Sequence, residues 1–141
     1  MIRLKEIDHL VLRVRDLEPM IRFYCDIIGC RIAWRRTEMG LVHLRAGSAM
    51  IDLVTVDGPT GSRLGAGPGA EGRNVDHFCL TVDDFDVESI SRHLEEHGFP
   101  PGKIASRFGA KGRGVSIYLN DPEGNGVELK GTEGEVEPAA D

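Results

Sequence analysis

Apolar and polar residues alternate along two short segments of the chain that resemble each other. Residues 7–17 read IDHLVLRVRDL and residues 75–85 read VDHFCLTVDDF, so that five of eleven positions are identical at an offset of 68. Alternation with a period of two is typical of a β-strand that has one buried face. The repeat therefore predicts a duplicated structural unit, and each copy opens with a strand.

A helical pattern follows each of these strands. Residues 19–28 have a broad apolar face before Gly29, and a second helix is expected over 87–97, with Asp86 as its N-cap and Gly98 after its end. Three strand-like segments then follow in each copy, at 31–36, 41–45 and 50–56 in the first and at 104–107, 115–120 and 126–130 in the second. The pattern predicts a βαβββ unit that occurs twice.

These elements predict an α+β fold of one domain over residues 1–141, since this length is typical of a single domain. Module one is expected at about 5–56 and module two at about 75–131. The segment 57–74 between them is rich in glycine and is expected to be a flexible linker or lid. The acidic end, 132–141, lacks periodicity and is expected to be disordered.

Charge and composition restrict the classes of partner. Lys and Arg number 17 and Asp and Glu 23, which gives a net charge of −6 and argues against nucleic acid or a membrane as the partner. The chain has no apolar run long enough to span a membrane, and its start lacks the apolar stretch of a secretion signal, so a cytoplasmic protein is expected. The three cysteines form no CxxC pair and support neither a disulfide framework nor a zinc ribbon.

The repeat also pairs residues that can bind a metal ion. His9 and His77 occupy equivalent positions in the two copies, and the last strand of each copy carries a carboxylate between aliphatic residues, Asp52 and Glu128. If the aliphatic residues face the core, alternation places both carboxylates on the face that holds the histidines. Two imidazoles and two carboxylates on one face predict a site for a divalent metal with coordination positions left open.

A structural role is the alternative for the two histidines. Each follows an aspartate, Asp8 or Asp76, that could bind it, although alternation is expected to place the aspartates on the opposite face. Burial of two carboxylates without a cation is costly, and this favours the metal site. Mixed nitrogen and oxygen ligands suit Fe, Mn, Co, Ni or Zn, and the sequence does not choose among these metals.

Three segments of the chain resemble the vicinal oxygen chelate superfamily, also called the glyoxalase/bleomycin-resistance/dioxygenase superfamily. They are the duplicated DHxxLxV strand, the helix end FYCDIIGCR and the stretch SIYLNDPEGNGVEL, and the likeness covers about residues 5–131 and is nearest to a poorly characterised glyoxalase-domain subgroup. The resemblance implies two modules that form an open, cup-shaped mixed sheet around a divalent metal, with helices on the outer face. His9, His77 and Glu128 match ligand positions, whereas Asp52 stands where glyoxalase I enzymes usually carry the longer Glu.

The resemblance implies a metal-dependent isomerase or lyase that acts on a small vicinal-oxygen substrate, such as the thiol adduct of a 2-oxoaldehyde. Glu128 is the expected catalytic base and Asp52 the second catalytic carboxylate. Arg13 lies on the same strand face as His9 and could bind an anionic substrate, although a salt bridge would explain it equally well. His43 is expected to be structural or, alternatively, a proton shuttle. The family likeness also implies a homodimer.

Three other activities stay open at this stage. An extradiol dioxygenase would need an upstream catalytic histidine, and Gly109, Ala110 and Lys111 stand in that region instead. Thiol transfer to fosfomycin uses two His and one Glu as ligands, but the chain has no clear match to the potassium-binding loop of those enzymes. Resistance proteins that only bind a drug generally lack the metal ligands. The sequence leaves the substrate, the reaction and the metal undecided.

Overall fold

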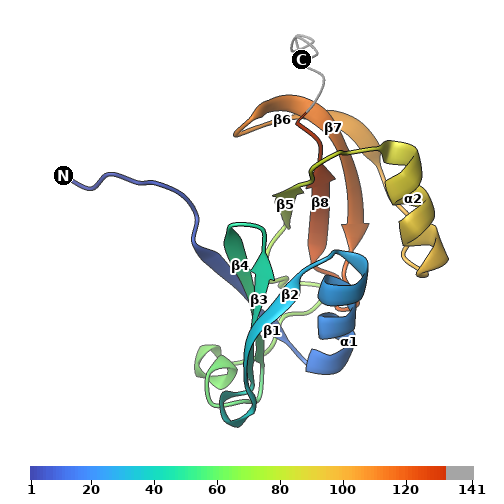
Figure 1. Ribbon diagram of the computed structural model, residues 1–141. Coiled ribbons are helices and arrows are strands. Elements are labelled where there is room, and N and C mark those ends of the chain that lie inside the picture. Colours follow the sequence, from blue (N-terminus) through green and yellow to red (C-terminus); the bar gives the residue numbers. More distant parts are fainter. Residues whose placement is uncertain (133–141) are drawn as a thin grey trace. The chain divides into compact units, whose positions relative to one another are not determined.

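The computed structural model describes residues 1–132, and these form two compact units that divide after Asn74 (Figure 1). The acidic end that was expected to be disordered lies outside the described residues, apart from Thr132. Within the described range no helix is long and apolar enough to cross a membrane.

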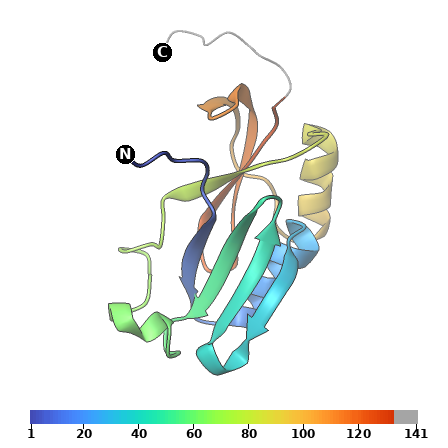
Figure 2. The ribbon, with the colours of Figure 1, turned by 60° about the vertical axis from the view of Figure 1, so that its left-hand side comes forward.

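The first unit contains a four-stranded mixed sheet with the order β1-β4-β3-β2 (Figure 2). Its strands are β1 (His9–Val14), β2 (Arg31–Arg36), β3 (Leu41–Ala46) and β4 (Ala49–Thr55). β1 is parallel to β4, and the other neighbours are antiparallel. β4 is therefore an inner strand, while β1 forms one edge of the sheet.

A helix packs against β4 in this unit. It begins as α1 (Leu17–Arg22), with the Asp16 carboxylate accepting a hydrogen bond from the Glu18 amide, and continues as a π-helical turn (Phe23–Ile27). The main buried apolar side chains come from the helix and from one face of the sheet: Leu12, Val14, Met20, Ile21, Phe23, Tyr24, Ile51 and Leu53. On β1, the core face alternates with an exposed face that carries Val11, as period-two packing requires.

The second unit repeats this topology with the strand order β5-β8-β7-β6. Its strands are β5 (His77–Thr81), β6 (Ile104–Gly109), β7 (Gly112–Asn120) and β8 (Gly126–Lys130). Again the first and last strands of the unit pair in parallel, which makes β8 an inner strand and β5 an edge.

The helix of the second unit, α2 (Val87–Glu96), follows β5 as expected. Its N-terminus is capped by the Asp86 carboxylate, which accepts a hydrogen bond of 2.8 Å from the Ser89 amide, and it buries Leu94. The chain leaves the helix through Gly98, whose φ of +79° is the left-handed conformation that glycine adopts easily. The predicted α+β fold with a duplicated βαβββ unit is confirmed.

The glycine-rich segment after β4 contains more structure than its composition predicts. It includes a 3₁₀ turn (Gly61–Leu64), and the Arg13 guanidinium donates hydrogen bonds to the carbonyl oxygens of Gly61, Gly65 and Ala66. The Asn74 side-chain amide bonds both the N–H and the C=O of Arg13 at the edge of β1. The segment is thus anchored to β1 at both of its ends.

Close packing in this segment requires a glycine at one position. A Cβ atom added to Gly61 would lie 1.9 Å from the backbone oxygen of Thr55, at the end of β4. Because that oxygen belongs to backbone, it cannot move away as a flexible side chain would. Gly69 lies in the same segment, and a Cβ atom there would meet nothing within 4 Å.

We expect Gly61→Ala to lower the free energy of unfolding by about 1–3 kcal/mol, the usual cost of overpacking. The matched substitution Gly69→Ala should leave it nearly unchanged. Urea denaturation followed by circular dichroism measures both. Equal midpoints for the two variants would show that the turn does not pack against Thr55.

Candidate metal centre

The second unit brings His77 into contact with Glu128. Glu128 on the inner strand β8 pairs in register with Cys79 on β5. Cys79 lies two residues after His77, so the side chains of His77, Cys79 and Glu128 share one face of the sheet. The Nε2 atom of His77 lies 3.1 Å from Oε2 of Glu128. Oε1 of Glu128 accepts a hydrogen bond of 2.5 Å from the Ser116 hydroxyl. A half-exposed imidazole therefore meets a carboxylate that is only 5% exposed.

The other ring nitrogen of His77 is held by Asp76. Nδ1 lies 2.5 Å from the Asp76 carboxylate, which favours the tautomer with the proton on Nδ1. In that tautomer the neutral ring turns the lone pair of Nε2 toward the Glu128 carboxylate. Two acceptors 3.1 Å apart repel each other unless a proton or a metal cation lies between them.

The first unit contains a related pair in which the contacts differ. Nδ1 of His9 lies 2.6 Å from the Asp8 carboxylate, and this hydrogen bond, together with the charge of Asp52, raises the pKa of His9 above its usual value. Asp52 itself is buried on β4, and its Oδ1 lies 2.8 Å from Nδ1 of His43 on β3. Asp52 thus has a direct partner in His43 and acts on His9 through its charge.

His43 is fixed from its other side by aromatic packing. The Trp34 ring on β2 stacks on the imidazole with 5.8 Å between the ring centres, and the Arg36 guanidinium lies 4.6 Å from the centre of the Trp34 ring. An irregularity of register between Ile32 and Trp34 brings Trp34 opposite His43. A structural role was expected for His43, with a proton shuttle as the alternative, and in the structure its imidazole contacts the Asp52 carboxylate.

The positions of Asp8 and Asp76 correct an expectation. Alternation was expected to turn both aspartates away from the histidines, but each binds Nδ1 of the histidine that follows it. The reason is that β1 begins at His9 and β5 at His77, so that the aspartates precede the strands. Period-two alternation does not apply outside a strand.

Comparison with known proteins identifies a family that matches this chain. Residues 6–129 match the model of the Glyoxalase/Bleomycin resistance protein/Dioxygenase superfamily. The chain belongs to this superfamily. A catechol-2,3-dioxygenase of Bacillus subtilis is 29% identical over 119 residues, which cover 84% of this chain and 38% of the dioxygenase. The chain therefore spans well under half the length of that relative.

Two further proteins match this chain along most of their own length. A probable lactoylglutathione lyase of Synechocystis is 28% identical over 131 residues, covering 86% of this chain and 91% of the lyase. The crystal structure of the virulence protein STM3117 from Salmonella typhimurium superposes with a TM-score of 0.76 at 25% identity, over 92% of this chain and 98% of the other. These likenesses support the superfamily fold and leave the specific activity undecided.

Members of the glyoxalase superfamily generally use divalent metal ions, and the His77–Glu128 pair fits one. Two ligands that bind a metal at about 2.1 Å and at a right angle lie about 3.0 Å apart, close to the 3.1 Å seen here. Asp76 acts on His77 as carboxylates commonly act on metal-bound histidines, by fixing the tautomer. Within residues 1–132 no group of three His, Cys, Asp or Glu side chains is gathered around a common point. The described residues thus show the contact of His77 with Glu128 and no assembled group of three potential ligands.

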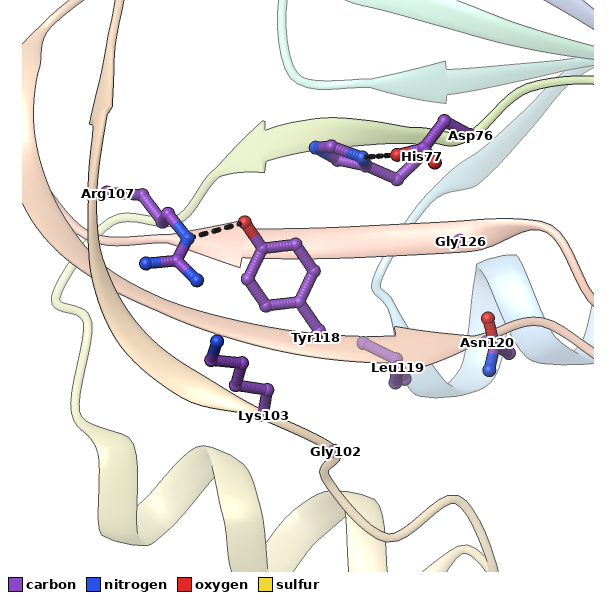
Figure 3. Close-up of a pocket in the computed structure, with 9 residues that line it drawn as sticks. All are labelled: Asp76, His77, Gly102, Lys103, Arg107, Tyr118, Leu119, Asn120 and Gly126. Atoms are coloured by element: carbon purple, nitrogen blue, oxygen red, sulfur yellow. Dashed lines mark hydrogen bonds and ion pairs between the residues drawn. The ribbon is translucent and has the colours of Figure 1, made fainter.

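A cavity of about 520 Å³ adjoins His77 in the second unit (Figure 3). Its wall includes Lys103, Arg107 and Tyr118. The Tyr118 ring packs edge-on against the His77 ring with 5.6 Å between centres, and Nε of Arg107 donates a hydrogen bond of 3.3 Å to the Tyr118 hydroxyl. None of these three residues was predicted from the sequence. The register of β7 and β8, which pairs Tyr118 with Glu128, is the signal that could have found Tyr118.

A smaller cavity of about 180 Å³ is lined by Glu128, Cys79 and Lys130. Lys130 is 5% exposed, and its ammonium donates a hydrogen bond of 2.8 Å to the Gly112 carbonyl. Partial burial of the sulfur and, secondly, the charge of Glu128 raise the pKa of Cys79 to about 11. The thiol is therefore protonated at neutral pH and is a poor nucleophile.

Arg13 was expected to bind an anionic substrate. Three of its N–H groups instead donate to backbone carbonyls of the glycine-rich segment. A substrate role for Arg13 stays a prediction, and the observed contacts give it a structural role.

The buried His43–Asp52 contact leads to a stability prediction. In metal-free protein, His43→Ala should lower the free energy of unfolding by about 1–3 kcal/mol, because it leaves the Asp52 carboxylate buried without its partner. Adding Asp52→Asn to this variant should recover part of the loss, since a neutral amide is less costly to bury. Strictly additive effects in urea denaturation of the two single variants and the double variant would refute the coupling.

The pKa of Cys79 leads to a second prediction. At pH 8 only about one thiol in a thousand would be ionised at a pKa of about 11, so alkylation by iodoacetamide should be far slower than that of glutathione. Glu128→Gln should speed the reaction, because it removes the negative charge that opposes the thiolate. Cys30, whose pKa is raised to about 11 chiefly by burial, should not respond and is the internal control. Peptide mass spectrometry separates the two rates.

Proposed function

We propose that the protein is a divalent-metal-dependent enzyme of the glyoxalase type, an isomerase or lyase that acts on a small vicinal-oxygen substrate such as the thiol adduct of a 2-oxoaldehyde. The observation that carries this proposal is the contact of 3.1 Å between Nε2 of His77 and Oε2 of Glu128, with Nδ1 of the histidine held by Asp76. This arrangement is electrostatically favourable when a cation is shared by the two groups.

His77 and Glu128 are the proposed ligands of the second unit, and His9 and Asp52 those of the first. The candidate metals are Ni, Co, Mn, Fe and Zn, which accept mixed nitrogen and oxygen ligands. A bound metal would act as a Lewis acid that stabilises negative charge on a chelated substrate oxygen. Because Oδ1 of Asp52 is tied to His43, a metal in the first unit would be bound through Oδ2 or through a bridging water molecule.

Glu128 is the proposed catalytic base, and Asp52 the second carboxylate. An isomerisation of this type moves a proton between adjacent carbons, which requires a carboxylate within reach of both. The Ser116 hydroxyl holds Oε1 of Glu128, so that the carboxylate is kept in one orientation on the face of the sheet. Because Glu128 is only 5% exposed, bulk water has little access to the group that would move the proton.

The relatives support the class of chemistry and keep a second candidate open. The Synechocystis relative is named a probable lactoylglutathione lyase, which agrees with the leading proposal. The Bacillus relative is named a catechol-2,3-dioxygenase, which keeps an extradiol-type dioxygenase as the second candidate. A panel of hemithioacetals, catechols and fosfomycin, assayed with each metal, separates these activities. We also propose a homodimer, which light scattering of the purified protein tests.

We expect His77→Ala to abolish stoichiometric metal binding, because it removes one ligand and leaves the carboxylate of Glu128 without the imidazole. His97→Ala, which removes an exposed histidine after α2, should bind metal like the wild type. Metal content after reconstitution and gel filtration measures both. Full occupancy in His77→Ala would overturn the proposed centre.

A further inference from the structure

Two cationic side chains that line the cavity beside His77 have no acidic partner among the described residues. No carboxylate within residues 1–132 lies in ion-pair contact with Lys103 or Arg107. Figure 3 shows both cationic groups pointing toward the Tyr118 ring. The acidic residue in the cavity wall, Asp76, has its carboxylate on Nδ1 of His77. The positive charge of the cavity is therefore not balanced by its described neighbours.

Arg107 is held in place although no carboxylate among residues 1–132 forms an ion pair with it. Its Nε donates to the Tyr118 hydroxyl at 3.3 Å and one terminal nitrogen donates to the Ser106 carbonyl at 3.1 Å. The guanidinium carbon lies 5.8 Å from the centre of the Tyr118 ring, on which it is partly stacked. These contacts orient the guanidinium and leave its other terminal nitrogen free to donate, so a ligand does not have to order a flexible side chain.

We propose that Arg107 and Lys103 form the anion-binding end of the substrate site, and that the substrate carries an oxyacid group, a carboxylate or a phosphonate, besides its vicinal oxygens. This proposal rests on the proposed function for the position of the vicinal oxygens. The Tyr118 ring lies between the cations and the ligand pair, since it contacts both the His77 ring and the Arg107 guanidinium. The oxyacid group and the chelating oxygens are thus separated by about the width of one aromatic ring.

The contrast with Arg13 strengthens this assignment. Arg13 uses three N–H groups on backbone carbonyls of its own unit, whereas Arg107 uses two and faces a cavity of about 520 Å³. Two like charges that line one cavity repel each other, and an anion between them removes this cost. Guanidinium and ammonium groups together are the usual donors to carboxylate and phosphonate oxygens.

Binding of simple anions to metal-stripped protein tests the proposal. Methylphosphonate and acetate are titrated at low ionic strength into protein freed of both metal and chelator, and chemical shifts of backbone amides are followed by NMR. We expect saturable shifts at Arg107 and Tyr118 for at least one anion, and none with acetamide, the neutral analogue of acetate. The affinity ratio of the two anions identifies the preferred oxyacid group. Absence of saturable binding by either anion would overturn the proposal.

Charge-removing variants provide the matched controls. Arg107→Met should weaken anion binding at least tenfold and Lys103→Met at least threefold, whereas Arg92→Met on α2 removes the same charge and should have no effect. Arg107→Met should bind metal like the wild type, and a loss of metal in this variant would contradict a role confined to the anion. A wild-type protein that binds the anion but no metal would refute the proposed function and leave the anion site standing.

Discussion

Burial of a carboxylate on an inner strand is the constraint on which the rest of each unit depends. Glu128 lies on β8 between β5 and β7 and is only 5% exposed, so bulk water solvates little of its charge. A buried carboxylate must be compensated by hydrogen bonds and positive charge, because the cost of desolvation otherwise exceeds any gain from packing. The adjacent strands supply the surroundings of Glu128: the Ser116 hydroxyl from β7 donates a hydrogen bond, and the His77 imidazole from β5 lies where a shared proton or metal cation would bring positive charge.

The two units meet the same constraint in different ways. At the strand position that pairs with the carboxylate, the first unit has His43 and the second has Tyr118. His43 binds Asp52 directly, whereas Tyr118 packs against His77 and leaves the imidazole to face Glu128. The carboxylate of Asp52 thus has a partner on the neighbouring strand of its own sheet, whereas the carboxylate of Glu128 faces the more exposed imidazole of His77. This asymmetry makes the second unit the stronger candidate to hold a cation.

Residue patterns could predict the fold and half of the candidate site. In β4 and β8 the carboxylate stands between two aliphatic residues. Alternation from this position predicts that Glu128 shares a sheet face with His77, as the structure shows. It failed for Asp8 and Asp76 because it does not say where a strand begins. These two aspartates hold the ring nitrogens of the histidines. That contact is possible because each strand begins at the histidine, and the sequence pattern does not give this starting residue.

The remaining part of the site depends on pairings that a single sequence does not encode locally. Arg107 reaches Tyr118 because β6 folds back on β7, and the partners of Arg13 are backbone carbonyls in a segment whose composition suggests only flexibility. Net charge was also a poor guide here. A charge of −6 argues against a polyanionic partner, yet Lys103 and Arg107 make the cavity beside His77 locally positive. Because screening in salt limits the field of exposed charges to about 10 Å, a small anion inside the cavity responds to these two cations rather than to the acidic surface of the whole protein.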